Sequence, residues 1–225
     1  PLECEEVAQR LLQLEPDLVL YSAPNPSTPG PKKVIDMLKG RRAIVVGDAP
    51  GIKIKEHLEE LGLGYIFVKA DSMIGARREF LDPTEMAIFN AEMLKVLSIT
   101  VAFKVITEEI DLAINDKDYL PHIIIGSGTA VSRSGIKNPY ARAKAKAAYE
   151  MAEMVGKLNI KGCFVQKEPD EYIQTVASAH ELLRAASMLA DEAREIEKMA
   201  DEVERMPHSP EGKLLKKRGL FEKPS

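Results

Sequence analysis

A proline-rich run near the start of the chain holds polar side chains that could bind a ligand. Ser22-Ala-Pro-Asn-Pro-Ser-Thr-Pro-Gly-Pro-Lys-Lys33 has four prolines in twelve residues, which argues against a strand or the interior of a helix. Because proline restricts the backbone, Asn25 and the hydroxyls of Ser27 and Thr28 would lose little conformational entropy on binding. We interpret the run as a stiff wall of a cleft, with Asn25 as its main polar contact.

Two further loops carry features that suit an anion. Gly47-Asp-Ala-Pro-Gly51 has glycines that permit close backbone approach, and it precedes a predicted helix whose N-terminal N–H groups attract negative charge. Lys53 and Lys55 add positive charge there. The next loop contributes Arg77 and Arg78, whose guanidinium groups can hold a carboxylate or phosphate through paired hydrogen bonds.

The elements that must position these loops are three apolar segments, residues 17–21, 41–46 and 64–69, separated by stretches with helical spacing. Strands that alternate with helices in this way predict a parallel sheet with crossover helices. The carboxyl ends of parallel strands share one edge, where such folds bind ligands. The three loops would then lie side by side and form one cleft for an anionic ligand.

Each of these features also has a purely structural interpretation. Proline and glycine loops often only connect elements, and Lys53 and Lys55 could be solvated helix residues. Asp48 could be only a helix N-cap. The two arginines could instead pair with nearby carboxylates, namely Glu79, Asp82 or Glu85.

Three long helices are expected after the third loop. Asp82-Pro-Thr-Glu85 has an N-cap residue followed by proline at N1, and apolar residues then recur with helical periodicity to about residue 114. A second helix opens at Asn138-Pro139, and a third runs from about residue 170 to 205. Long helices with short connectors favour a bundle.

The chain is therefore predicted to be an α/β protein, with a parallel sheet and crossover helices, then a helical bundle region and a small C-terminal β segment. We expect an α/β cofactor-binding domain at residues 1–81 and a helical domain at 82–205, with a short isolated strand near 122–126. Residues 206–225 would form a hairpin or arm.

The composition of the chain limits the kinds of partner and site that can be expected. The chain of 225 residues has a formal net charge of −4, which gives no reason to expect nucleic acid. Cys4 and Cys163 are far apart in sequence, so neither a disulfide framework nor a zinc site is expected. With no apolar run of membrane-spanning length and no recognisable signal peptide, we expect a cytoplasmic protein.

Common catalytic signatures are missing from the sequence. It contains no G-x-G-x-x-G, Walker A, G-x-S-x-G or H-E-x-x-H motif, and its four histidines have no pair with metal-ligand spacing. We predict no metal and no catalytic nucleophile or acid–base residue. A reaction that depends mainly on positioning, such as hydride transfer between two bound organic molecules, fits this pattern.

Several long runs resemble one family. They are PNPSTPGPKK, VVGDAPGIKIKE, LGYIFVKADSMIGARREFLDPTEMAIFNAEMLKVL, GCFV, VASAHELLR and MPHSPEGKLLKKRGLFEKP. In this order, from near Pro1 to Ser225, they are similar to the F420-dependent methylenetetrahydromethanopterin dehydrogenases of methanogenic and related archaea. GARREFLDP with its flanks is the most unusual of these runs.

The resemblance implies reversible hydride transfer between reduced coenzyme F420 and methenyl-tetrahydromethanopterin, in archaeal one-carbon metabolism and methanogenesis. It also implies F420 as a dissociable cosubstrate, no metal, and a homohexamer with clefts between domains and subunits. F420 carries a phosphodiester and a glutamate tail, which require a cationic cradle rich in N–H groups. The methenyl substrate is already a cation and accepts hydride directly, so the protein has to align two ring systems and exclude water.

The resemblance assigns the loops to the two ligands. The predicted F420-binding residues are Pro24, Asn25, Gly47, Asp48, Ala49, Pro50, Lys53, Arg77 and Arg78. The predicted substrate-binding residues are Asp71, which would accept pterin N–H groups or only cap its turn, and His180, which would contact the pterin or only pack between helices.

Members of the family begin with a further strand and glycine-rich loop, so the resemblance implies that this chain is an N-terminally shortened form. The alternative from another class is a non-catalytic oligomeric binding or scaffold protein derived from the family. The missing dinucleotide fingerprint counts against a nicotinamide dehydrogenase.

Overall fold

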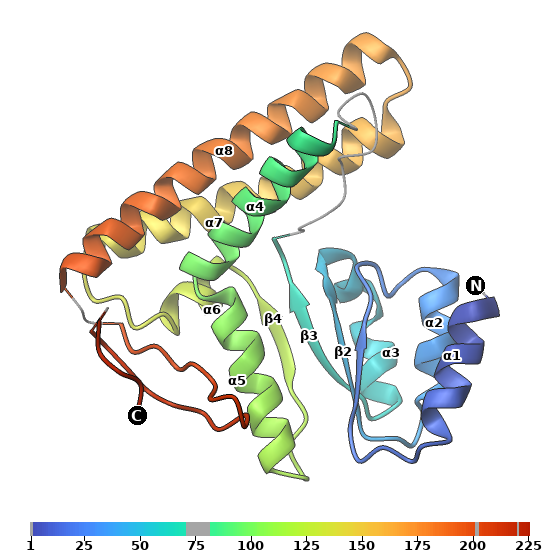
Figure 1. Cartoon of the computed structure of the whole chain (residues 1–225). Coiled ribbons are helices and arrows are strands. Elements are labelled where there is room, and N and C mark those ends of the chain that lie inside the picture. The colour runs from blue at the N-terminus through green and yellow to red at the C-terminus, as the bar shows by residue number, and fades with distance from the viewer. Residues whose placement is uncertain (1, 71–81, 201–202, 220) are drawn as a thin grey trace. The chain divides into compact units, whose positions relative to one another are not determined.

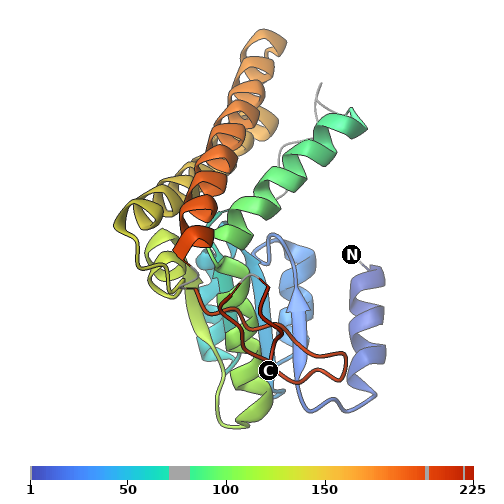
Figure 2. The same cartoon turned by 60° about the vertical axis from the view of Figure 1, so that its left-hand side comes forward.

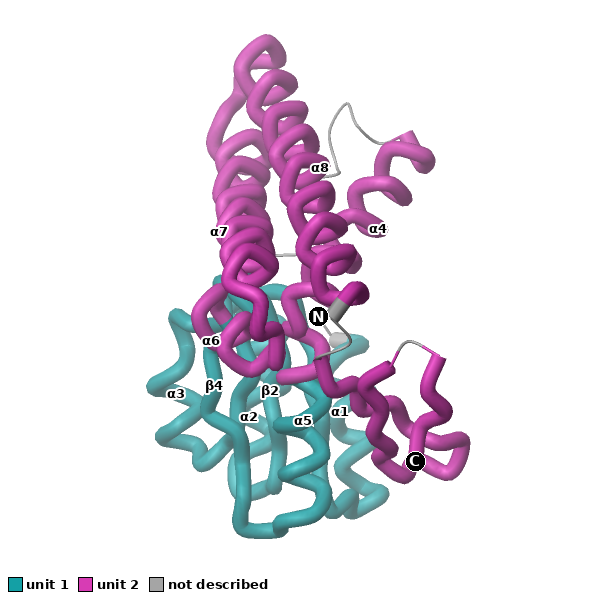
Figure 3. Tube along the Cα trace, turned by 90° about the vertical axis from the view of Figure 1, so that its left-hand side faces the viewer, with its two compact units in different colours: residues 1–71, 106–125 teal, residues 72–105, 126–225 magenta. Residues whose placement is uncertain are grey.

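The protein is described here from a computed structural model, which covers residues 2–70, 82–200, 203–219 and 221–225 (Figure 1). The chain divides into two compact units, residues 1–71 with 106–125 and residues 72–105 with 126–225 (Figure 3). The predicted α/β class is confirmed, because the first unit contains a parallel sheet with crossover helices.

The sheet has four parallel strands in the order β1-β2-β3-β4. They are β1 (Val19–Ser22), β2 (Ala43–Asp48), β3 (Gly64–Val68) and β4 (His122–Ile125). All five residues of β3 are buried, as are most of β2, which is typical of inner strands of a sheet with both faces covered. The core of this unit forms where these strands meet buried helix residues such as Ile35 and Leu58.

The helices of this unit that precede β3 are α1 (Leu2–Leu12), α2 (Pro29–Met37), the 3-10 helix η1 (Ala49–Ile54) and α3 (Lys55–Glu60), and most of α5 (Ala102–Asn115) also belongs to it. The helix after β1 begins within the proline-rich run, at Pro29, and its prolines lie in the first turn of α2 and not in the helix interior. The N–H groups of a first helical turn have no intrahelical partner, so Pro29 and Pro31 lose no hydrogen bond there.

The strand β4 does not belong to the helical domain, where the sequence analysis had placed it. The strand predicted near residues 122–126 is present, but it pairs with β3, from Tyr65↔His122 to Val68↔Ile125, and belongs to the first unit. An isolated strand would leave its backbone N–H and C=O groups without ladder partners, and the open edge of β3 supplies them. Arg42, just before β2, also donates to the carbonyls of Asp116 at 2.8 Å and Lys117 at 3.0 Å, and so anchors the segment that leads into β4.

The second unit is built on three long helices that pack together: α4 (Pro83–Ile99), α7 (Pro139–Ile160) and α8 (Pro169–Ala200), with the short α6 (Ser127–Ser132) before α7 (Figure 1). Both predicted N-caps are confirmed. The Asp82 carboxylate accepts from Thr84 N at 2.7 Å, and the Asn138 side chain accepts from Tyr140 N at 2.9 Å and Ala141 N at 3.2 Å. These caps satisfy N–H groups that the helices cannot pair internally.

The predicted continuous helix from residue 82 to 114 is divided in two. α4 ends at Ile99 and α5 (Ala102–Asn115) begins after a corner where Val101 has φ +71. Such a left-handed conformation is rare for a β-branched residue. The apolar periodicity continues through the corner, so the pattern of residues did not reveal it.

A π-helical turn, Lys161–Val165, joins the end of α7 to the connector before α8, and the sequence had not predicted it. Gln166 N donates to Lys161 O at 2.9 Å, five residues back. A Cβ on Gly162 would lie 2.7 Å from Val176 Cγ2 of α8. The wider turn therefore seats this glycine against the neighbouring helix.

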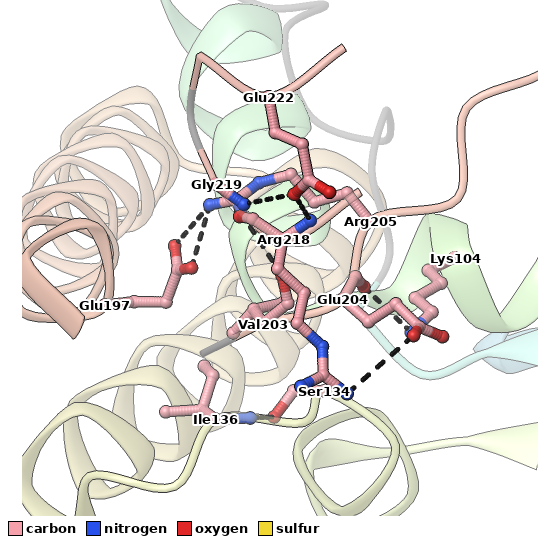
Figure 4. A network of polar contacts seen from close by, with 10 residues as sticks. All are labelled: Lys104, Ser134, Ile136, Glu197, Val203, Glu204, Arg205, Arg218, Gly219 and Glu222. Atoms are coloured by element: carbon pink, nitrogen blue, oxygen red, sulfur yellow. Dashed lines mark hydrogen bonds and ion pairs between the residues drawn. The ribbon is translucent and has the colours of Figure 1, made fainter. Parts of the chain in front are cut away.

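The C-terminal arm, residues 203–225, doubles back on itself through antiparallel bridges between Arg205 and Lys217 and between His208 and Leu214 (Figure 2). The Arg205 guanidinium donates to both carboxylate oxygens of buried Glu197 at 2.8 Å (Figure 4). The Glu222 carboxylate accepts from Arg218 N at 2.6 Å and Gly219 N at 2.8 Å. The pair of Arg205 with Glu197 thus holds the arm to α8, and the Glu222 carboxylate closes the turn near the C-terminus.

Among the described residues, no single helix has the length and apolar character needed to cross a membrane, although α4 and α5, bent where they meet, pass that criterion as a pair.

Candidate functional site

Two of the three predicted loops lie side by side at the carboxyl edge of the sheet. β1 and β2 are paired up to Ser22 and Val46, and their loops are joined beyond that point. Ala23 N donates to Val46 O at 2.9 Å, and Asp48 N donates to Pro24 O at 3.2 Å. This edge brings together seven of the predicted cofactor residues: Pro24, Asn25, Gly47, Asp48, Ala49, Pro50 and Lys53.

The polar groups of the first loop are partly bound to one another. Asn25 Oδ1 accepts from Ser27 N at 3.2 Å and from Ser27 Oγ at 2.6 Å, while Thr28 Oγ1 donates to Asn25 O at 2.9 Å. The two hydroxyl protons are therefore committed within the loop. What Asn25 can offer a ligand is its amide Nδ2, a hydrogen-bond donor suited to a carbonyl or phosphate oxygen.

The glycines of the second loop were predicted to let a ligand approach the backbone. In the structure, other parts of the protein approach them instead. A Cβ on Gly47 would lie 2.7 Å from Ala23 O and 3.0 Å from Pro26 Cδ. A Cβ on Gly51 would lie 2.5 Å from Phe67 Cε1 and 2.9 Å from Pro26 Cγ. Protein atoms thus approach these backbones, and the buried ring of Pro26, which sequence analysis missed, lies against both glycines.

Asp48 lies where β2 ends and the next helical segment begins. It occupies the N-cap position of η1 in an extended conformation, but its side chain makes no capping hydrogen bond. The predicted helix that follows begins earlier than expected, as the 3-10 turns of η1. Asp48 therefore takes the N-cap position that the structural interpretation expected, but without a side-chain capping hydrogen bond.

The two lysines of this segment differ. Lys53 is exposed, whereas Lys55 is half-buried and its Nζ lies 3.9 Å from Glu59 Oε1 of α3. A third cation, Lys69, was not singled out from the sequence, although it directly follows the buried strand β3. It is exposed, and its backbone N–H donates to Ile125 O at 2.9 Å.

Three predicted residues, Asp71, Arg77 and Arg78, lie outside the described residues. His180 belongs to α8 in the second unit, where its ring centroid lies 4.6 Å from that of Phe89 on α4. Burial lowers the pKa of His180, while the nearby Glu85 and Glu181 carboxylates raise it. The arrangement fits the helix-packing interpretation, with a neutral imidazole near neutral pH.

Taken together, the described part of this edge offers donors to an anionic ligand: the Asn25 amide, the Lys53 ammonium and the Lys69 ammonium. A phosphate-bearing molecule fits such a set, because its oxygens accept hydrogen bonds and carry negative charge. Within residues 2–70, 82–200, 203–219 and 221–225, no three His, Cys, Asp or Glu side chains gather closely enough to hold a metal ion.

Comparison with known proteins is consistent across sequence and structure. The family described as methylene-5,6,7,8-tetrahydromethanopterin dehydrogenase matches residues 1–225. The F420-dependent methylenetetrahydromethanopterin dehydrogenases of Methanothermobacter marburgensis and Methanocaldococcus jannaschii are 51% and 50% identical to the chain, and each match covers 100% of the chain and 84% of the relative.

A solved structure of F420 dependent methylene-tetrahydromethanopterin dehydrogenase, in complex with methylene-tetrahydromethanopterin and coenzyme F420, superimposes with a TM-score of 0.90. It is 47% identical in sequence, and the match covers 99% of this chain and 83% of that one. The chain therefore belongs to the family of methylene-5,6,7,8-tetrahydromethanopterin dehydrogenases.

Proposed function

We propose that this protein is an F420-dependent methylenetetrahydromethanopterin dehydrogenase, which transfers a hydride reversibly between coenzyme F420 and methylene/methenyl-tetrahydromethanopterin. The observation that carries the proposal is the agreement with the solved complex, at a TM-score of 0.90 and 47% identity over 99% of the chain. Such agreement over nearly the whole chain includes the sheet edge where the predicted loops lie.

F420 would lie along the edge formed by Pro24, Asn25, Gly47–Pro50 and Lys53, with Arg77 and Arg78 toward its anionic parts. The donor groups of Asn25 and Lys53 suit its phosphodiester and glutamate tail. Bound F420 supplies the hydride donor and acceptor. Asp71 is the proposed contact to the tetrahydromethanopterin substrate, and His180 is the second, as the alternative to its packing against Phe89.

The residues of this chain would act by binding and orientation. The stiff first loop presents Asn25 with few alternative conformations, and the packed edge excludes water from one side of the bound rings. No residue is proposed as a nucleophile or as a general acid or base, because the methenyl substrate is a cation that accepts hydride without prior protonation.

The setting of the enzyme is proposed as well. We expect a cytoplasmic enzyme of archaeal one-carbon metabolism and methanogenesis, assembled as a homohexamer. Phe164 and Val165, neighbours in the π-helical turn, are 70% and 66% exposed, and contiguous exposed apolar surface is typical of protein interfaces. Light scattering coupled to size-exclusion chromatography tests this, and a monomer at working concentration would contradict it.

The function is tested with purified protein and reduced F420. Oxidation, followed as the return of deazaflavin absorbance, is expected only when methenyl-tetrahydromethanopterin is present. Equal turnover with NADH in place of reduced F420 would overturn the coenzyme assignment. Binding of both ligands without turnover would favour the non-catalytic scaffold instead.

A further inference from the structure

We propose that Pro26 is a positioning residue for hydride transfer, and that Gly47, Gly51 and Phe67 form the seat that holds it. This inference deepens the proposed function, because it concerns the geometry of the same F420-binding edge. Pro26 itself would touch neither ligand. It would fix the place of its neighbours Pro24 and Asn25, which belong to the proposed binding surface.

The first half of the seat is Gly47, the fifth residue of β2. A Cβ there would meet Pro26 Cδ at 3.0 Å, Pro26 Cγ at 3.1 Å and Ala23 O at 2.7 Å. Real Cβ atoms almost never approach other heavy atoms below 3.0 Å. The first loop can therefore lie this close to β2 only because residue 47 has no side chain.

The second half connects the loop to the core of the sheet. A Cβ on Gly51 would meet Phe67 Cε1 at 2.5 Å and Pro26 Cγ at 2.9 Å. Phe67 is fully buried on β3 and stacks on Tyr65, with ring centroids 5.1 Å apart. Pro26 and Phe67 thus close on Gly51 together, so the position of the loop follows that of the rigid core.

Hydrogen bonds hold the chain on the N-terminal side of this contact. Ala23 N donates to Val46 O at 2.9 Å and Asp48 N donates to Pro24 O at 3.2 Å. On the other side, Asn25 Oδ1 accepts from Ser27 N and Ser27 Oγ. The Pro26 ring lies between these anchors and leaves the loop little freedom to shift.

A reaction without an acid–base residue depends strongly on such placement. Misplacing a bound reactant by about 1 Å can cost on the order of 100-fold in rate. Pro26 would supply this precision through packing alone. Because the Pro26 ring is buried, its removal also costs packing energy, so the kinetics of the F420-dependent reaction must be measured to distinguish positioning from packing.

The test compares three variants of the full chain. Gly47→Ala forces the first loop away from β2, because the added carbon meets the backbone oxygen of Ala23. Pro26→Ala removes most of the proline ring that packs against Gly47 and Gly51. Gly128→Ala is the matched control, since a Cβ at that position meets nothing within 4 Å. We expect the first two to lower kcat/KM for F420 by about tenfold or more, and the control to leave it unchanged.

The readout separates positioning from folding. The kcat, the KM for F420, the KM for methenyl-tetrahydromethanopterin and the Tm are measured for each variant, and kcat/KM for F420 is expected to change most. A lowered Tm with kcat/KM for F420 within twofold of the wild-type value in both variants would reduce Pro26 to a structural residue. Failure of the proposed function is distinct, since the wild-type protein itself would then not turn over F420.

Discussion

At the scale of single residues, Lys53 and Lys55 show how neighbouring cations acquire different roles. Lys55 lies 3.9 Å from Glu59 one helical turn away, whereas Lys53 is exposed at the start of the segment after β2. An exposed i,i+4 pair contributes little to stability. Of these two lysines, Lys53 is therefore the one that we expect to meet an anionic ligand.

We predict that Lys53→Ala weakens F420 binding, and most for F420 species with long glutamate tails, because each added carboxylate lengthens the anionic part of the ligand. Lys55→Ala is the matched control and should change binding much less. Fluorescence titration with F420 of defined tail length measures both. An equal loss for all tail lengths would place Lys53 away from the tail.

His180 should make stability depend on pH. Burial lowers its pKa in the folded protein from the ordinary 6.5, so the unfolded chain takes up a proton first as the pH falls. Where the unfolded state binds more protons, stability rises with pH. The contribution of His180 is therefore complete above pH 6.5 and is lost progressively as the pH falls below it.

Urea unfolding across this range, for the wild type and His180→Gln, measures the effect. The wild type should lose more stability than the variant between about pH 7 and pH 5. Parallel curves for the two proteins would show that His180 does not titrate differently on folding.

At the scale of elements, helix caps and the ends of strands could be predicted from the sequence. Asn138 was expected to open a helix and does so, with its side chain accepting from two backbone N–H groups. The helix it opens, α7, packs small buried residues such as Ala145, Ala148 and Ala152 within the helical unit. A weakened cap therefore acts on a helix that contributes to the core.

We predict that Asn138→Ala lowers the free energy of unfolding by about 1 kcal/mol, because Tyr140 N and Ala141 N lose their acceptor. Asn138→Asp keeps an acceptor and adds negative charge near the helix N-terminus, so it should retain wild-type stability. Thermal unfolding of the wild type and the two variants measures these differences in stability. Equal losses in both variants would show that the amide has another function.

Other elements could not be recognised from local patterns. The corner at Val101 interrupts an apolar period that continues on both sides, and the π-helical turn at Lys161–Val165 depends on the contact of Gly162 with α8. Likewise, the apolar run at residues 122–125 could have been an isolated strand until its pairing with β3 was seen. The strand and the π-helical turn both depend on partners distant in the sequence.

At the scale of the whole molecule, the C-terminal arm shows how a terminal segment is held. Arg205 donates to both oxygens of Glu197, to Val203 O at 3.2 Å and to Arg218 O at 2.6 Å (Figure 4). Its backbone also exchanges two hydrogen bonds with Lys217. Glu197 is buried, so removal of its partner would leave a carboxylate with much of its hydration lost.

We predict that Arg205→Ala destabilises the protein by about 3 kcal/mol and makes the arm a substrate for limited proteolysis. Lys216→Ala, which removes only the exposed contact to Glu204 at 3.6 Å, is the control and should cost under about 0.5 kcal/mol. Equal protease resistance of all three proteins would show that the arm is held by other contacts.

The sequence by itself determined the parallel α/β class, the helix starts at Asp82 and Asn138, the loops after β1 and β2, and the resemblance to the family. These depend on short-range patterns: alternation of elements, capping residues and long runs of specific residues. Only the tertiary structure decided that β4 completes the sheet and that Gly47 and Gly51 receive Pro26 and Phe67. Contacts between residues far apart in the chain decide such features, and no local pattern encodes which surfaces will meet.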